Sequence, residues 1–388
     1  MNILDQSPLV VVNNATDRFF AWLANDALPF WSTNGVDWEG GGFAEQLTPE
    51  GDLIADVRRA RLVARQIFAF RSAGALGWSG PVDRLVDHGL TALLNNHLTP
   101  ECDVVPRYLP AAGRGEGAFD LYDQAFVLFG LAHGYAQTRN SELERVALAV
   151  LGSMKEGWAL PAGGFAEDRP PRAPLKANPH MHLLEAALAW MDVSTATAWP
   201  DLASNLVDLC TTHFIDPKTG SLHEFFDTDW SVLGGSSDVV EPGHQVEWAW
   251  LLMRWSSMTQ AQGHERVIEQ LIAIAESSGL NAQQHRLVNE LDPELSTRDG
   301  RLRLWPQTER IKALVALYER QKDPIVAKKI AQAVEALLGY SEHPIRGSWW
   351  EHFDEGGRPL REPARASSLY HIMGAANELA RLTGMTLA

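Results

Sequence analysis

The segment EPGHQVEWAW, residues 241–250, decides the fold because the chain repeats its pattern several times. Pro242 and Gly243 break the preceding segment, and His244 and Glu247 then begin a helix that turns apolar. Their three-residue spacing puts the imidazole and the carboxylate on one face of that helix. A polar pair at the mouth of an otherwise apolar helix indicates the inner wall of a barrel, facing a pocket.

Six turn-rich segments recur along the chain at intervals of 62, 60, 57, 66 and 61 residues. They can be aligned on Glu45, Arg107, Glu167, Glu224, Glu290 and Glu351. Helical periodicity lies between them, at residues 58–72, 118–137, 178–192, 244–258, 306–321 and 367–382. Each interval has room for two helices and a hairpin.

Six units of two helices predict an all-α fold, a closed (α/α)6 barrel with short β-hairpins in the loops at one end. No linker or low-complexity tract interrupts the sequence, so we expect one catalytic domain over residues 1–388. An open helical solenoid is the alternative. Solenoids, however, usually have shorter repeats with a plainer consensus and polar capping units.

The composition narrows the function classes. A hydrophobic content of 45% with 21% charged residues is typical of a globular protein. The net charge of −16 argues against nucleic acid and anionic membranes as partners. Only two cysteines, Cys102 and Cys210, argue against a disulfide framework or a cysteine-rich metal site. With no signal peptide and no stretch as long as a membrane span, we expect a cytoplasmic monomer or homodimer.

The repeat also predicts a site. One polar group near the start of each unit's second helix recurs at steps of 59, 58, 65, 62 and 62 residues. If six helices enter a barrel from one end, these groups meet at a common rim and form a pocket. The six are Arg65, Gln124, His182, Glu247, Glu309 and His371.

Each motif has a functional and a structural interpretation. His244 beside Glu247 suits general acid–base work, but Glu247 could merely complement the helix dipole, or the pair could bind a metal. His182 shares a helix face with Asn178 and Glu185, whereas His180 diverges from it; a capping asparagine with a core histidine is the alternative. Arg65 in an apolar helix indicates either an interhelical ion pair or an oxyanion clamp.

Three further helix starts carry candidate groups. Tyr122 opens one of them, and Trp305, Gln307 and Glu309 lie together at another, where Pro306 suits a first turn. Trp305 could offer a platform for a sugar ring. His371 is in phase with the other histidines, in a helix that a serine could cap.

The motifs NPHMHLLEA, PGHQVEW, RLWPQTE and SSLYH, with ARQ near residue 65, resemble the N-acylglucosamine 2-epimerase superfamily, and most closely its D-mannose isomerase branch. The resemblance covers nearly the whole chain, and the family fold is the (α/α)6 barrel. It implies His371, His244, Glu247, His182 and Arg65 as catalytic residues. It also implies substrate contacts at Tyr122, Asn178, Trp305 and Glu309, and we add Gln307 as a candidate.

The resemblance implies an aldose–ketose isomerase that interconverts D-mannose and D-fructose through a cis-enediol(ate). His371 would move the proton between C2 and C1. His244, held by Glu247 and helped by His182, would open the ring and shuttle protons among the oxygens. Arg65 would stabilise the enediolate. A sugar 2-epimerase is the alternative, since it shares the first proton removal but returns the proton to the opposite face of C2.

We expect a small neutral monosaccharide as substrate, with no metal and no cofactor. Residues 219–253, which lead into the central motif, contain no lysine or arginine to hold a phosphate. A phosphorylated sugar is therefore the weaker alternative. A non-catalytic carbohydrate-binding toroid would have to keep three histidines idle. A glycoside hydrolase would need two carboxylates flanking the bond, which a histidine-rich rim does not favour.

Overall fold

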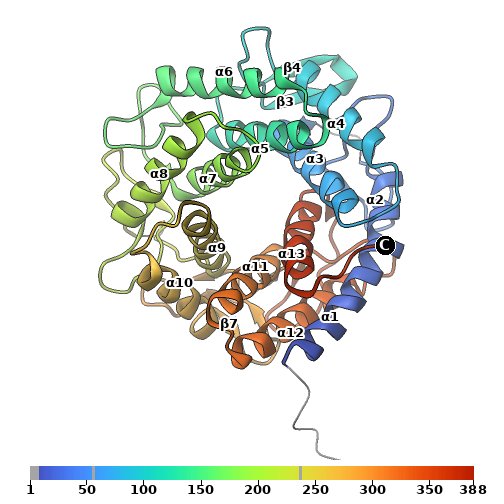
Figure 1. The fold of residues 1–388 in the computed structure, drawn as a ribbon, viewed down its shortest axis with the longest axis vertical. Helices are drawn as coiled ribbons and strands as arrows, with labels where there is room; N and C mark the ends of the chain where they lie inside the picture. The colour runs from blue at the N-terminus through green and yellow to red at the C-terminus, as the bar shows by residue number, and fades with distance from the viewer. Residues whose placement is uncertain (1–7, 55–56, 236–237) are drawn as a thin grey trace, which may run out of the picture.

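Six inner helices stand around one axis in a computed structural model that describes residues 8–54, 57–235 and 238–388 (Figure 1). Each inner helix packs against the next, and the last packs against the first. This closure confirms the predicted (α/α)6 barrel and excludes the open solenoid. The inner helices are α3 (Ala60–Ala75), α5 (Leu121–Thr138), α7 (Ala177–Met191), α9 (Pro242–Thr259), α11 (Leu304–Gln321) and α13 (Ser368–Thr383).

An outer helix backs each inner one. α4 (Val82–Asn96), α6 (Ser141–Trp158), α8 (Ala198–Leu209), α10 (Glu265–Ser277) and α12 (Pro324–Leu338) pack against the inner helices that precede them in the chain. A π-helical turn, Leu23–Ala27, joins α1 (Pro8–Trp22) to α2 (Leu28–Asn34). Because α1 packs against α12 and α13, the first helix completes the last hairpin and the two ends of the chain meet.

Short strands lie at the end of the barrel where the inner helices begin. Three pairs are hairpins: β3 (Arg107–Leu109) with β4 (Arg114–Glu116), β7 (Leu280–Asn281) with β8 (Arg286–Leu287), and β9 (Glu290–Leu291) with β10 (Thr297–Asp299). Four pairs join different repeats: β1 (Gln46–Leu47) with β13 (Ala364–Arg365), β2 (Arg58–Arg59) with β3, β5 (Leu175–Lys176) with β6 (Phe225–Phe226), and β11 (Leu302–Arg303) with β12 (His352–Phe353). The strands therefore connect neighbouring repeats as well as forming the expected hairpins.

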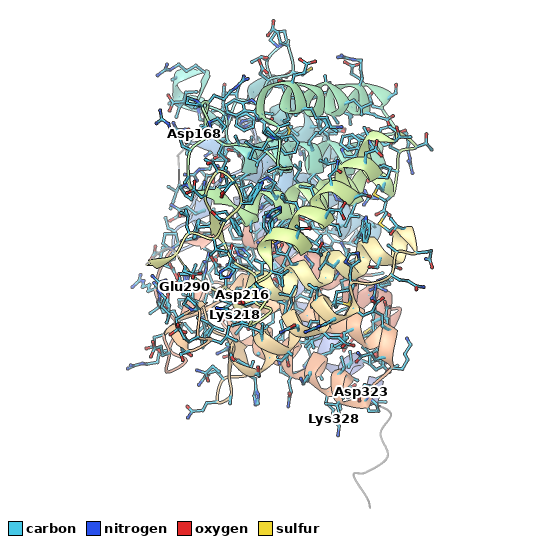
Figure 2. The ribbon with its side chains drawn as sticks, turned by 90° about the vertical axis from the view of Figure 1, so that its left-hand side faces the viewer. Asp168, Asp216, Lys218, Glu290, Asp323 and Lys328 are labelled. Atoms are coloured by element: carbon cyan, nitrogen blue, oxygen red, sulfur yellow. The ribbon has the colours of Figure 1, made fainter. Side chains whose placement is uncertain are left out.

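The loops at the two ends of the barrel differ. Seen from the side, the loops that carry Asp168, Asp216 and Glu290 gather at one edge of the molecule (Figure 2). Asp323, at the turn between α11 and α12, lies towards the other. β2, β5 and β11 each end immediately before an inner helix, and two residues separate β13 from α13. The first edge therefore holds the polar helix starts that the repeat predicted.

The inner helices are buried on nearly every side, because each lies between an outer helix and the barrel axis. In α9 even His244, Gln245 and Glu247 are buried beside the tryptophans. A buried polar group costs free energy unless it is hydrogen-bonded or paired, so these side chains must find partners inside the barrel. Within the described residues, no helix is long and apolar enough to cross a membrane.

The contact between α3 and α5 depends on a glycine. A Cβ atom placed on Gly130 would lie 2.7 Å from the Cβ and 2.8 Å from the Cα of Ala64, which is closer than packed carbons approach. Gly152 on α6 offers a contrast, because a Cβ placed there meets nothing within 4 Å. The same substitution should therefore have opposite effects at the two sites.

We predict that Gly130→Ala lowers Tm and that Gly152→Ala raises it. Overpacking costs about 1–3 kcal/mol, which exceeds the gain of about 1 kcal/mol from replacing a helical glycine by alanine. At Gly152 only that gain applies. Thermal unfolding followed by circular dichroism measures both variants, and an equal rise in Tm would mean that α3 and α5 can separate without cost.

Candidate active site

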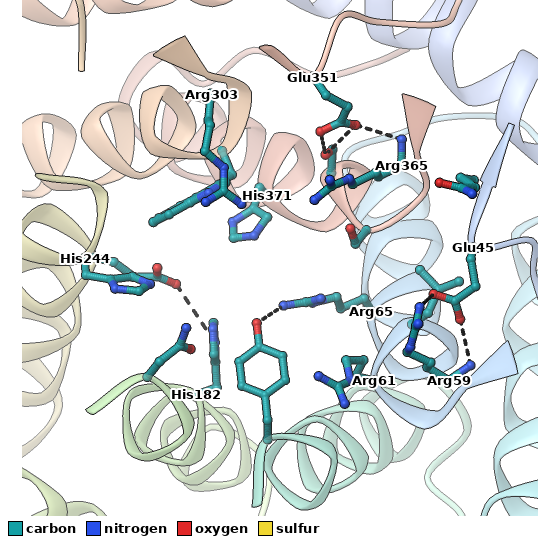
Figure 3. A pocket seen from close by; sticks show the side chains of 18 of the residues that line it. Glu45, Arg59, Arg61, Arg65, His182, His244, Arg303, Glu351, Arg365 and His371 are labelled. Carbon is teal, nitrogen blue, oxygen red and sulfur yellow. Dashed lines mark hydrogen bonds and ion pairs between the residues drawn. The ribbon is translucent and has the colours of Figure 1, made fainter. Parts of the chain in front are cut away.

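A cavity of about 530 Å³ opens at the end of the barrel where the inner helices begin (Figure 3). Eight of the ten residues predicted from the sequence line it, and together they come from all six inner helices. They are Arg65, Tyr122, Asn178, His182, His244, Glu247, Trp305 and His371. As predicted, the side chain of His180 diverges from that of His182, and it lies outside the pocket lining. It accepts a hydrogen bond from the Phe165 N–H and donates one to the Lys176 carbonyl.

Two expected substrate contacts do not line the pocket. The Gln307 amide is hydrogen-bonded to both the N–H and the carbonyl of Leu287, so it ties α11 to strand β8. Glu309 is fully buried behind His371 and accepts a hydrogen bond from it. Gln124, which the repeat placed at the rim, is buried outside the pocket lining too. Both substrate-contact assignments are therefore corrected: Gln307 positions a strand, and Glu309 positions a histidine.

Each pocket histidine is held through Nδ1 by a buried glutamate. A carboxylate that accepts the Nδ1–H fixes the tautomer and leaves Nε2 free for a ligand. The Nδ1–Oε distances are 3.2, 2.9 and 2.8 Å, for the pairs His182–Glu185, His244–Glu224 and His371–Glu309.

The partner of His244 differs from the one expected. The sequence paired His244 with Glu247, but Nδ1 of His244 is held by Glu224, from the turn before β6. Glu247 instead faces His182, with a carboxylate oxygen 4.0 Å from its Nδ1. The helix spacing suggested the wrong pair because it considers contacts within one helix only. Glu224 occupies the repeated turn position in the sequence, and this repetition was the one sign that it could contact an inner helix.

The histidines differ in charge. Burial alone would lower the pKa of His244, but the carboxylates of Glu224 and Glu241 outweigh burial and raise it to about 10. Burial lowers the pKa of His182 to about 4. Burial also lowers the pKa of His371, against the opposing effect of Glu309. At neutral pH, His244 is therefore a cationic acid, and His371 and His182 are neutral.

A layer of buried charges lies beneath the pocket. The Lys312 ammonium is 2.5 Å from a carboxylate oxygen of Glu309 and 3.8 Å from the ring centroid of Trp250. Burial, with Glu309 nearby, raises the pKa of Glu247 well above its ordinary value. The protonated form of Glu247 is thus favoured more than that of an ordinary carboxyl group, and its Oε1 is buried without a hydrogen-bond partner among the described residues. It can exchange hydrogen bonds with a bound hydroxyl group.

Arg65 brings a positive charge to the opposite wall. Its guanidinium donates to the Tyr122 hydroxyl at 2.5 Å and lies 4.0 Å from the ring centroid of Phe126. Neither partner is a carboxylate, and within the described part of the chain Arg65 does not form the interhelical ion pair considered from the sequence. Trp305 stands between the other two walls, with ring centroids 5.0 Å from His244 and 5.7 Å from His371. The pocket thus combines a cationic acid, a neutral base, an aromatic face and a guanidinium.

The sequence profile of the N-acylglucosamine 2-epimerase family matches residues 41–375. The chain belongs to the N-acylglucosamine 2-epimerase family. A mannose-6-phosphate isomerase of Rhizobium meliloti is 36% identical over 374 residues, which cover 92% of this chain and 95% of the relative. A cellobiose 2-epimerase of Bacteroides fragilis is 23% identical, with 89% and 92% covered.

Solved structures share the fold of this N-acylglucosamine 2-epimerase family member. A D-mannose isomerase superposes with a TM-score of 0.84 at 20% identity, covering 95% of this chain and 97% of that one. The cellobiose 2-epimerase of Spirochaeta thermophila reaches 0.87 at 18% identity, covering 98% and 99%. The chain accordingly belongs to a family of sugar isomerases and epimerases. Family membership alone does not distinguish isomerisation from epimerisation.

Three clusters of this family member could offer metal ligands. Each joins one pocket histidine to two glutamates whose ligand atoms lie within 4.8 Å of one another. In each cluster a carboxylate already accepts the Nδ1–H of the histidine, and in one of them Lys312 already neutralises Glu309. The donors thus fit a hydrogen-bonded acid–base network, and a metal-independent site remains our expectation.

We predict that Glu224→Gln moves the basic limb of the activity profile to lower pH. If His244 acts as the acid, as the resemblance implies, activity is lost as the pH rises through its pKa. Removing the Glu224 charge lowers that pKa, so the loss should begin at lower pH. The measurement is kcat/KM as a function of pH.

Glu167→Gln is the matched control, because Glu167 occupies the same turn position but pairs with Lys176 rather than with a histidine. Its pH profile should match that of the unmodified protein. An unshifted basic limb in Glu224→Gln would show that His244 is not the acid.

Proposed function

We propose that this protein is an aldose–ketose isomerase that interconverts a D-mannose-type aldose and the corresponding D-fructose-type ketose. The observation that carries the proposal is that one pocket holds two histidines, each fixed through Nδ1 by a buried glutamate, so that both Nε2 atoms are available to a substrate. His371 is neutral and can accept a proton, whereas His244 is cationic and can donate one. Arg65 adds a guanidinium without a carboxylate partner, which suits the negative oxygen of an enediolate.

In the proposed reaction His244 first donates its proton to the ring oxygen, and the bond between C1 and that oxygen breaks. The anomeric hydroxyl loses its proton, which is relayed back to His244, and the open-chain aldehyde forms. Nε2 of His371 then removes the proton from C2, and the electrons of the C–H bond form the C1–C2 double bond while O1 becomes negative. Arg65 stabilises that oxygen. His371 returns its proton to C1 as the O2 hydroxyl loses its proton and becomes the ketone, and O1 is protonated. Glu247, in its protonated form, and neutral His182 can relay protons between the oxygens.

The similarity to named relatives supports isomerisation over epimerisation. The Rhizobium meliloti isomerase is more similar over almost its whole length than the Bacteroides fragilis epimerase is. The same pocket keeps epimerisation as the second candidate, because cationic His244 could protonate the opposite face of C2 after His371 has removed the proton. The two reactions differ in where the proton returns: to C1 in isomerisation, and to the opposite face of C2 in epimerisation.

Proton NMR in D2O tests the proposal directly, with D-mannose and D-mannose 6-phosphate in separate incubations. A ketose product with deuterium at C1 supports the isomerase, and a glucose-type product with deuterium at C2 supports the epimerase. Absence of exchange at C1 and C2 with both sugars would rule out both reactions and favour a non-catalytic sugar-binding barrel.

We predict that His371→Asn and His244→Asn each lower kcat by about 10²–10⁴-fold, the usual contribution of a general acid or base. The two variants should differ in kind. Without His371, exchange at C2 should vanish even when the sugar is supplied in its open-chain form. Without His244, exchange should be slow but partly recovered with sugars that spend more time open. Deuterium exchange and circular dichroism on the same samples separate lost chemistry from lost fold.

His180→Asn is the contrasting control, because the imidazole of His180 ties Phe165 to α7 and lies outside the pocket. It should lower Tm while exchange per folded molecule is kept. If His244→Asn behaves in this way instead, His244 has only a structural role.

We also predict that EDTA leaves the activity intact, since the proposed proton transfers use only side chains. The measurement is the initial rate before and after chelation. A loss of activity that a divalent ion restores would overturn this and assign one of the His–Glu clusters to a metal.

A further inference from the structure

A basic residue stands six positions before the pocket-level residue in four of the six repeats. All four end the strand that leads into an inner helix: Arg59, Lys176, Arg303 and Arg365. Arg59 and Lys176 are neutralised, by Glu45 at 2.9 Å and by Glu167 at 2.8 Å. Across the described ranges, Arg303 and Arg365 form no salt bridge. Both line the pocket without a carboxylate at salt-bridge distance, while Glu241 and Glu351 act on Arg303, and Glu351 on Arg365, from further away.

Comparison of the first and last repeats shows why the Arg365 guanidinium does not pair with the turn glutamate. In the first repeat, Glu45 accepts hydrogen bonds from both the backbone N–H and the guanidinium of Arg59. In the last repeat, Glu351 accepts the backbone N–H of Arg365 at 2.8 Å in the same way. The oxygens of Glu351, however, also accept from the Ser368 hydroxyl at 2.9 Å. The guanidinium of Arg365 is left to face the pocket mouth (Figure 3).

Arg303 is held only weakly. Its nearest hydrogen-bond acceptor is the Asn289 amide oxygen, at 3.4 Å, and its guanidinium carbon lies 5.5 Å from the ring centroid of Trp305. Burial lowers the pKa of Arg303 and the charge of Arg365 lowers it further, although Glu241 opposes both. Arg303 is half-buried and Arg365 is exposed. An anion between two guanidinium groups that repel each other would be stabilised by both.

The two guanidinium groups lie on either side of His371 (Figure 3). Arg365 precedes His371 by six residues, and Arg303 precedes Glu309, the carboxylate that holds His371, by six as well. Both arginines therefore stand at the strand ends that lead into α11 and α13, at the mouth of the pocket. A substrate whose C1 and C2 reach His371 would therefore place the far end of its carbon chain near the mouth. Arg303 and Arg365 are positioned to bind a group on that end.

We propose that Arg303 and Arg365 form an anion subsite, and that the substrate is an aldose carrying a phosphate ester or a carboxylate at the end remote from its carbonyl. The reaction at the other end rests on the proposed function. The inference departs from the neutral substrate expected from the sequence. That expectation considered residues 219–253, whereas the arginines that reach the pocket come from β2, α3, β11 and β13.

The test compares D-mannose, D-mannose 6-phosphate and D-mannuronate as substrates, and measures their binding by calorimetry. The unmodified protein should favour one of the two anionic sugars over D-mannose in both kcat/KM and affinity. Arg303→Gln and Arg365→Gln should each reduce kcat/KM for that anionic sugar about 10- to 100-fold, mainly through KM, because each removes a hydrogen bond to a charged group. Each variant should lose less kcat/KM for D-mannose than for the anionic sugar.

Lys176→Gln is the matched control. Lys176 occupies the equivalent strand position, but it pairs with Glu167 and lies outside the pocket lining. It should leave the preference for the anionic sugar unchanged. Comparison of the two anionic sugars tells a phosphate subsite from a carboxylate subsite.

Equal or better use of D-mannose, or equal losses for charged and neutral sugars in the arginine variants, would overturn the subsite while leaving the isomerase proposal intact. Absence of exchange with all three sugars would overturn the isomerase proposal. The subsite would then be decided by the binding measurements alone, and equal affinity for charged and neutral sugars would rule it out.

Discussion

The ion pair between Glu309 and Lys312 is the contact on which the site depends. Both side chains are buried at the barrel axis, where an isolated charge would cost several kcal/mol to desolvate. Burial would raise the pKa of Glu309, but Lys312 and His371 outweigh it and lower the pKa. Because Glu309 therefore stays ionised, it can accept the Nδ1–H of His371 and leave the outer nitrogen of that imidazole as a base. The proposed basicity of His371 thus depends on the buried ion pair between Glu309 and Lys312.

The same layer separates two cavities. Above it lies the pocket of about 530 Å³, and below it a smaller cavity of about 190 Å³ that Glu185 and Lys312 help to line. One lysine is shared among three glutamates, so the three cannot all be ionised without mutual repulsion. Glu185 and Glu309 have lowered pKa values, and that of Glu247 is raised. The glutamate that faces the pocket is therefore the one whose protonated form is favoured.

The sequence predicted the architecture well because the repeat is long and the inner helices are strongly periodic. It predicted which faces of those helices meet, and so eight of the ten site residues line the pocket. It failed at Gln307 through helix phase, at Glu309 through depth, and at Glu224 through a contact between separate elements. Gln307 is two residues from both Trp305 and Glu309, so it points away from them, as His180 does from His182. Glu309 has the right phase but is buried, and periodicity predicts the face of a residue without its depth. Glu224 was missed because its histidine lies 20 residues away, on another element.

The repeated turn glutamate shows how one structural position acquired different uses. In the first repeat Glu45 binds the backbone and side chain of Arg59, and in the third Glu167 binds Lys176. Glu224 and Glu351 occupy the same position in the fourth and sixth repeats. Glu224 binds a histidine instead of a strand-end cation, and that exchange raises the pKa of the histidine. Glu351 binds a backbone N–H and a serine, and that exchange leaves an arginine free. In these four repeats the carboxylate joins a turn to the start of the next inner helix. The chemistry of the site depends on which group at the start of the inner helix is bound by this carboxylate.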